Sequence, residues 1–376
     1  MARKLLLTLA ILTVAILILG SLIFKKNLNK QTKLPITFPT ILPRAQEKAV
    51  VAENLEVPWA LVFLPDKSML LTERKGRVRF IDKDGNLNPN PILQIPDVKA
   101  NGEGGLLGIA IHPNFKANQF VYLYYTYSGN ELKTLNRVAR FKFENNTLLE
   151  KTIIVDAIPG APNHNGGRIK FGPDKFLYIT TGDAQNPSLA QDKNSLAGKI
   201  LRLSDDGKVP KDNPFDNPVY SYGHRNAQGL AWGPNGTLWA TEHGRSGVLS
   251  GLDELNLIEI GKNYGWPVIQ GDETRKNMVT PKINSGPFTT WAPAGAAYIN
   301  GSVFFGGLKG QTLYEAVIKN DEVATIKEHF KKEFGRIRDV VVGPDNLLYI
   351  TTSNRDGRGT PKPNDDKIIR VNPQKL

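Results

Sequence analysis

The stretch "FGPDKFLYITTGD", Phe171 to Asp183, decides the fold because similar stretches recur along the chain. Each has an apolar residue, a proline followed by Asp or Asn, a few turn residues and a β-rich run. Proline presets φ for the second turn position, and Asp or Asn favours the bend. Each copy therefore predicts a turn that leads into a strand. The other copies are "FLPDKSMLLTER" from Phe63, "IHPNFKANQFVYLYYTY" from Ile111, "WGPNGTLWATEHG" from Trp232 and "VGPDNLLYITTSN" from Val342.

The spacing of the copies indicates six units. Their starts differ by 48, 60, 61 and 110 residues, so the last gap has room for one degenerate copy. The candidate is "GSVFFGGLKGQTLYEAV", from Gly301. Six units of about 55 residues, without helical periodicity of any length, match an all-β, six-bladed β-propeller of four-stranded antiparallel blades. A solenoid is the alternative architecture.

Composition excludes several classes of function. The chain has 376 residues, 40% of them apolar, with 35 Gly and 25 Pro, as in a folded, turn-rich protein. Its net charge is +12, but six unopposed cations precede residue 35 and the remaining +6 is spread widely. We therefore expect no nucleic-acid partner. The absence of cysteine excludes disulfides, thiolate metal sites and a cysteine nucleophile.

The N-terminal segment "MARKLLLTLAILTVAILILGSLIFKKNLNK" has a basic start and then an apolar run from Leu5 to Phe24. A run of about 20 apolar residues is long enough to cross a bilayer as a helix. A cleaved signal peptide has a shorter apolar core and a small-residue cleavage site, so we expect an uncleaved membrane anchor over residues 1–26. A Pro-containing tether is expected over residues 27–48, and the propeller over residues 49–376.

Propellers carry their functional groups on loops at one end of the channel, so residues that break the repeat are the candidates. Taken singly, each has an ordinary structural explanation, such as a turn histidine, a blade-linking arginine or a solvated carboxylate. Together they predict a positively lined pocket for a small polyanion, with one general base. The candidates are Glu103, His164, His224, Arg225, Asn226, Glu242, Asp253, Glu254, Lys309, Arg336 and Arg338.

Six ordered blocks resemble the soluble quinoprotein sugar dehydrogenases, the glucose/sorbosone dehydrogenase family that includes bacterial aldose sugar dehydrogenases. The resemblance extends from about Leu55 to the C-terminus. The blocks are "EGGLLGIAIHPNF", "HNGGRIKFGPDKFLYITTGD", "GHRNAQGLAWGPNG", "DELNLIEIGKNYGWP", "GGLKGQTLYE" and "GRIRDVVVGPD".

The resemblance implies oxidation of an aldose to its lactone by pyrroloquinoline quinone (PQQ) with Ca²⁺. In this family pattern His164 takes the proton of the anomeric hydroxyl while hydride passes to the quinone C5. Asp183 orients His164. Arg225 stabilises charge on the quinone oxygen, and Asn226 binds the cofactor beside it.

The same resemblance assigns the remaining ligands of the cofactor and metal. Lys309, Arg336 and Arg338 match the residues that hold the three PQQ carboxylates. The carbonyls of Gly244 and Arg245 match ligands of the cofactor-bridging Ca²⁺. Glu254 and the Tyr264 carbonyl match a second, structural Ca²⁺.

Three positions depart from the family pattern. Glu103 stands where characterised members carry Gln against the quinone, and adds a negative charge there. Asn163 precedes His164 where the glucose enzyme has Asp, so the sugar contacts are expected to differ. Trp291 is a candidate substrate or lid residue. We also expect Gly166 and Gly167 to leave room for the cofactor.

The resemblance further implies an external electron acceptor and a location outside the cytoplasm, so we expect the anchor to run from inside to outside. Two other functions stay open. One is a Ca²⁺-dependent sugar lactonase, which needs carboxylates and amides around the metal. The other is a surface-tethered binding module without cofactor, for which Glu103 is the argument.

Overall fold

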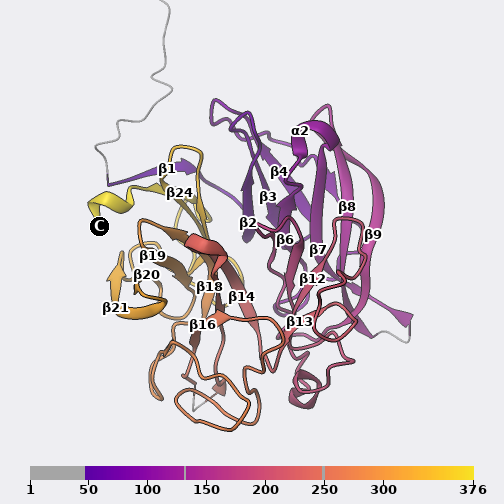
Figure 1. Cartoon of the computed structure of the whole chain (residues 1–376). Helices are drawn as coiled ribbons and strands as arrows, with labels where there is room; N and C mark the ends of the chain where they lie inside the picture. The colour runs from indigo at the N-terminus through magenta and orange to yellow at the C-terminus, as the bar shows by residue number, and fades with distance from the viewer. Residues whose placement is uncertain (1–46, 131–132, 248–249) are drawn as a thin grey trace, which may run out of the picture. The chain divides into compact units, whose positions relative to one another are not determined.

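The computed structural model describes residues 47–130, 133–247 and 250–376 (Figure 1). The expected anchor and nearly all of the tether lie outside these residues. Within the described ranges, none of the helices has the length and apolar character needed to span a bilayer.

Six four-stranded antiparallel sheets make up the described residues from Lys48 to the C-terminus and form the blades of a β-propeller, as predicted. The first three are β2(Pro58–Phe63), β3(Met69–Glu73), β4(Arg77–Ile81), β5(Leu93–Gln94); β6(Leu106–Ile111), β7(Phe120–Ser128), β8(Thr134–Glu144), β9(Thr147–Pro159); and β10(Ile169–Phe171), β11(Leu177–Thr180), β12(Lys199–Leu203), β13(Val219–Tyr222). The last three are β14(Ala227–Trp232), β15(Leu238–Glu242), β16(Glu254–Ile258), β17(Ile283–Asn284); β18(Pro293–Ile299), β19(Ser302–Gly307), β20(Thr312–Lys319), β21(Glu322–His329); and β22(Ile337–Val342), β23(Leu348–Thr352), β24(Ile368–Val371), β1(Lys48–Ala52).

The recurring Pro-Asp turns join the first two strands of a blade. In the first blade, the Asp66 carboxylate accepts hydrogen bonds from the N–H and hydroxyl of Ser68 at 3.0 and 2.6 Å. Such a side-chain bond fixes the bend locally, which explains why the motif recurs. The degenerate copy is a blade as well, because β18 turns into β19 through Asn300 and Gly301, both at positive φ (+53° and +80°).

The blades close into a ring. The first strand of each blade lies toward the centre, and β2 contacts both β6 and β22, the first strands of the second and last blades. A solenoid has no such contact between its two ends, so the alternative architecture is wrong. The strand β1 completes the last blade by pairing with β24, with Lys48 opposite Val371.

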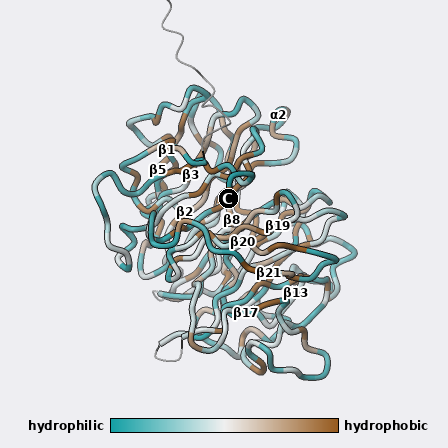
Figure 2. Tube along the Cα trace, turned by 90° about the vertical axis from the view of Figure 1, so that its left-hand side faces the viewer, coloured by the Kyte–Doolittle hydropathy of each residue, from teal (hydrophilic) through white to brown (hydrophobic). Residues whose placement is uncertain are grey.

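Apolar side chains fill the space between blades. The largest cluster includes Trp59, Tyr122 and Tyr124, each at most 2% exposed. Figure 2 shows hydrophobic colour along many strand segments and hydrophilic colour over many of the loops. The helical elements with described bounds are short and include one turn of α-helix, α2(Phe115–Asn118), and the 3-10 turns Pro187–Ala190, Pro234–Gly236 and Pro373–Lys375.

Strand direction separates the two ends of the propeller. Because successive strands of a blade are antiparallel, the Pro-Asp turns all lie at one end. The loops between second and third strands, and the segments that enter each first strand, lie at the other end. Residues that break the repeat fall in these loops and segments, so the topology brings them together.

Candidate active site

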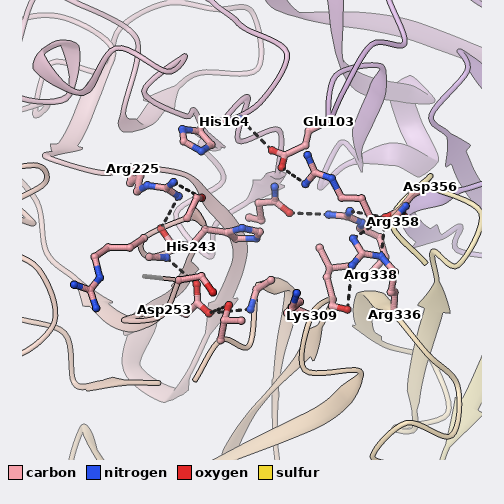
Figure 3. Close-up of a pocket in the computed structure, with 18 of the residues that line it drawn as sticks. Glu103, His164, Arg225, His243, Asp253, Lys309, Arg336, Arg338, Asp356 and Arg358 are labelled. Carbon is pink, nitrogen blue, oxygen red and sulfur yellow. Dashed lines mark hydrogen bonds and ion pairs between the residues drawn. The ribbon is translucent and has the colours of Figure 1, made fainter. Parts of the chain in front are cut away.

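A cavity of about 360 Å³ opens at the end opposite the Pro-Asp turns. Residues from all six blades, or from the segments that enter their first strands, contribute to it, so the cavity is complete only when the ring is closed. Figure 3 shows His164 and Arg225 on one side, the arginines 336, 338 and 358 on the other, and His243 between them. Its charged and histidine side chains are Arg74, Glu103, His164, Arg225, His243, Arg245, Asp253, Lys309, Arg336, Arg338, Asp356 and Arg358.

His164 precedes β10 and is held by Asp183, which follows β11. The His164 Nδ1 lies 2.8 Å from Asp183 Oδ1, and Asp183 is fully buried. The other carboxylate oxygen accepts a hydrogen bond from Trp266 Nε1 at 2.8 Å. A carboxylate beside Nδ1 favours the tautomer with the proton on that nitrogen, which leaves Nε2 free to accept one. The predicted pair is therefore brought together, and Trp266 is a partner that the sequence did not indicate.

Glu103 lies beside the same histidine. Its Oε2 accepts the backbone N–H of His164 at 3.1 Å, and its Oε1 lies 2.6 Å from Arg358 Nη1. Burial alone would raise the pKa of the Glu103 carboxyl, but His243, the His164 N–H and Arg358 lower that pKa to about 2. The carboxylate is thus ionised and paired, so the extra negative charge expected at this position is already compensated within the chain.

Arg225 enters the cavity from the segment before β14. Its guanidinium donates to the His243 carbonyl at 3.3 Å and to Ser246 Oγ at 2.7 Å, while Nε is buried without a partner in the described structure. Burial lowers the pKa of Arg225. Asn226 does not line the cavity: it is fully buried, and its Oδ1 accepts the Gly166 N–H at 2.9 Å.

Three of the predicted basic residues lie together on the opposite wall. Arg336 pairs with Asp356 through two bonds of 2.9 and 2.8 Å, and Arg338 donates to Gln228 Oε1 at 2.7 Å. The Lys309 ammonium has no hydrogen-bond or ion-pair partner among the described residues. Burial and neighbouring guanidinium groups lower the pKa of Arg338 to about 9. This wall therefore has more positive than negative charge and favours an anionic ligand.

His243 was not among the sequence candidates. Its ring lines the cavity, and its Nε2 is buried without a hydrogen-bond partner among the described residues. Burial lowers the pKa of His243, so the ring is neutral at neutral pH. The motif "TEHG" was visible in the sequence, but only the carboxylates near it were considered.

The predicted calcium ligands surround two neighbouring spaces. Gly244 and Arg245 line both the main cavity and a void of about 10 Å³ that Glu254 and Tyr264 also line. Burial, with Glu242 close by, raises the pKa of Glu254, and the acceptor oxygen Gln270 Oε1 has no partner within the described structure. Buried, unsatisfied oxygen acceptors suit a hard cation. In the described ranges no three histidine, aspartate or glutamate side chains are grouped as metal ligands, so backbone carbonyls would have to contribute.

Besides Asn226, two further expectations about the site need correction. Trp291 does not line the cavity: it is 6% exposed and packs against Phe305 and Tyr314 with ring centroids 5.4 and 5.5 Å apart. The glycines 166 and 167 do not leave space for a cofactor. A Cβ on Gly166 would meet the Thr180 carbonyl at 2.5 Å, so these glycines allow backbone segments to pack closely.

The sequence and structure are similar to those of known proteins. The model of a family described as glucose/sorbosone dehydrogenase matches residues 55–369. Aldose sugar dehydrogenase YliI of Escherichia coli (strain K12) is 33% identical over 88% of this chain and 94% of its own. Quinoprotein glucose dehydrogenase B of Acinetobacter calcoaceticus is 36% identical over 60% of this chain and 53% of its own. The PQQ-bound aldose sugar dehydrogenase of Streptomyces coelicolor has a TM-score of 0.80 and 38% identity, over 86% of this chain and 96% of that one.

Proposed function

The chain belongs to the glucose/sorbosone dehydrogenase family, and on that premise we propose that it is a PQQ- and Ca²⁺-dependent aldose dehydrogenase. The proposed reaction oxidises the anomeric carbon of an aldose to the lactone. The observation that carries the proposal is the cavity itself, in which a carboxylate-oriented histidine faces a wall of buried, incompletely neutralised arginines.

His164 is the proposed general base. Its Nε2 takes the proton of the anomeric hydroxyl as the C1–H bond breaks and a carbonyl forms at C1. Asp183 Oδ1, which lies 2.8 Å from Nδ1, accepts the Nδ1–H hydrogen bond and stabilises the positive charge that the ring acquires. The αL backbone of His164, at φ +61°, fixes the direction in which the ring enters the cavity.

Lys309, Arg336 and Arg338 are the proposed ligands of the three cofactor carboxylates, because their charges lie together and are only partly neutralised by Asp356. Arg225, whose Nε has no partner among the described residues, is placed to stabilise negative charge on the opposite side. When bound, PQQ would accept the hydride from C1 and Ca²⁺ would increase its electrophilicity.

We propose two Ca²⁺ positions. The carbonyls of Gly244 and Arg245 would hold the ion beside the cofactor, and Glu254 with the Tyr264 carbonyl would hold a structural ion. The buried carboxyl of Glu254 and the unpartnered Gln270 oxygen support the second position.

The alternatives have less support. A lactonase of the propeller type needs several carboxylate and amide side chains around its metal, whereas in this cavity six arginines outnumber three carboxylates. A binding module without cofactor would not need a buried Asp183 on the Nδ1 of His164.

We also propose that the protein works outside the cytoplasm, held by an uncleaved helix within residues 1–26, and passes electrons to an external acceptor. The apolar run from Leu5 to Phe24 supports this. Protease added to spheroplasts should degrade the propeller but not a cytoplasmic marker, and protection of the propeller would refute the orientation.

The test of the proposed function uses the full-length protein in detergent, reconstituted with PQQ and Ca²⁺. We expect reduction of an artificial electron acceptor with at least one aldose, and none without PQQ. His164→Ala should retain the cofactor but lose turnover. Folded protein that neither binds PQQ nor reduces the acceptor would refute the dehydrogenase proposal.

A further inference from the structure

Arg358 joins three segments of the chain at the cavity (Figure 3). It lies in the loop between β23 and β24, and its Nη1 is 2.6 Å from Glu103 Oε1. Its Nη2 donates to Asn163 Oδ1 at 2.8 Å. Glu103 in turn accepts the backbone N–H of His164 at 3.1 Å. Because Asn163 and His164 are consecutive, Arg358, Glu103 and the Asn163–His164 peptide form a closed ring of contacts, called the ring below.

The backbone at the centre of this ring has an unusual conformation. His164 has φ +61°, in the left-handed region that a non-glycine residue adopts at an energetic cost. Gly182 packs directly against it, since a Cβ on Gly182 would meet the His164 carbonyl oxygen at 1.9 Å. Such a conformation persists when its surroundings fix it from several sides, and the ring supplies the contacts opposite Gly182.

The ring also depends on charge. The Glu103 side chain is 18% exposed and the Arg358 side chain 53% exposed. Without Arg358 a largely buried carboxylate would face the cavity with only the His164 N–H as a strong donor, and would be drawn toward solvent or another cation. The half-exposed Arg358 can therefore hold the more deeply buried Glu103 carboxylate in place.

The same loop contacts the basic wall. The backbone N–H of Arg358 donates to Asp356 Oδ1 at 2.9 Å, and Asp356 Oδ2 accepts from Arg336 at 2.8 Å. A continuous set of contacts thus runs from Arg336 through Asp356, Arg358 and Glu103 to His164.

We propose that Arg358 is a positioning residue that holds the His164 backbone in its productive conformation through Glu103 and Asn163. The inference rests on the proposed function, in which His164 is the base. Both terminal nitrogens of Arg358 are already bonded within the chain, which fits a positioning role better than direct recognition of sugar or cofactor.

The test compares Arg358→Gln, Arg358→Lys, Glu103→Gln and the double variant Glu103→Gln/Arg358→Gln with Lys362→Gln, which removes an exposed cation from the same loop. The first measurement is amide hydrogen exchange at His164 in the cofactor-free protein. Arg358→Gln should accelerate exchange about tenfold or more, with the control unchanged. This measurement does not require turnover.

The second measurement is steady-state kinetics of the reconstituted enzyme. Arg358→Gln should lower kcat at least about tenfold, as expected for a displaced catalytic group, while KM and the Kd for PQQ change less than about threefold. The double variant should lose clearly less than the sum of the two single losses, because the Glu103 contact is shared. Arg358→Lys should recover part of the rate, because lysine can pair with Glu103 but cannot bond both partners in a fork.

Each other result overturns the proposal. Normal His164 exchange in Arg358→Gln would show that the ring does not fix the backbone. A KM increase with unchanged kcat would make Arg358 a substrate contact, and a parallel loss of PQQ affinity would make it a cofactor contact. Additive losses in the double variant would separate the two residues. If the unmodified protein has no turnover, the proposed function fails, and the exchange measurement alone still decides whether Arg358 positions His164.

Discussion

Replacing Asp183, the partner of His164, with asparagine removes one negative charge and leaves the volume of the side chain almost unchanged. The buried carboxylate accepts three hydrogen bonds: from His164 Nδ1 at 2.8 Å, from the Gln185 N–H at 2.8 Å and from Trp266 Nε1 at 2.8 Å. Oδ1 serves the first two and Oδ2 serves the tryptophan. An asparagine has one oxygen and one NH₂ group, so it cannot accept on both sides.

Both orientations of the amide are unfavourable. With the NH₂ toward His164, the ring must accept at Nδ1 and carry its proton on Nε2, which removes the base. By analogy with a catalytic Asp→Asn change that imposes the wrong tautomer, kcat should fall up to about 10⁴-fold, or about 5 kcal/mol. With the NH₂ toward Trp266, two donors face each other and stability falls by about 1–3 kcal/mol.

The assay is reduction of an artificial acceptor by the PQQ- and Ca²⁺-loaded enzyme, together with PQQ affinity and a thermal melt. We expect a kcat loss of at least about 100-fold with PQQ affinity unchanged. Asp66→Asn, in a Pro-Asp turn at the other end of the propeller, is the matched control and should keep full activity. If kcat of Asp183→Asn stays within threefold of the unmodified enzyme, Asp183 does not set the tautomer of His164.

Three other predictions follow from the site. Arg338→Gln should weaken PQQ binding about 10- to 100-fold and reduce its salt dependence, because one buried cation is lost from the wall; unchanged affinity by titration would refute this assignment. Chelation of Ca²⁺ should lower the melting temperature. The decrease should grow as pH rises above about 4.5, because the raised pKa of Glu254 makes its ionisation costly in the folded, metal-free protein. Glu254→Gln should remove that pH dependence, and a melting temperature that changes with neither chelation nor the substitution would exclude the structural ion. Glu103, with its pKa lowered to about 2, should contribute about 1–3 kcal/mol to the free energy of unfolding above pH 4.5, and this contribution should be lost as pH falls toward 2. Glu103→Gln should lack this loss of stability in acid. Identical acid unfolding curves for the variant and the unmodified protein would contradict the prediction.

The repeating part of the fold could be predicted because its signal is local. A proline and an aspartate fix each turn within a few residues, and the degenerate copy at Gly301 was found from the spacing alone. The pairing of β1 with β24 has no local signal, since Lys48 and Val371 are 323 positions apart and each strand is an ordinary apolar run.

The site was predictable where a residue type had an obvious chemical use. His164, Arg225 and the basic wall were found in this way, whereas Asp183 was assigned only through the family resemblance. Arg358 and Asp356 were missed because "NRDGRG" has the composition of a turn, and only the closed ring brings it beside Glu103. Trp291 was misplaced for the opposite reason: a tryptophan beside a glycine-rich segment suits a pocket and a core equally well, and packing decides between them.

The closure of the last blade by β1 also has a consequence for synthesis. Among the described strands β1 is synthesised first and its partner β24 last, so this blade cannot be completed until nearly the whole chain has been made. The cavity takes Arg74 from an early segment and Arg336 from a late one, so it is complete only after the last blade has been made. The arginines of the basic wall therefore join His164 and Arg225 late, when the last blade packs against the first.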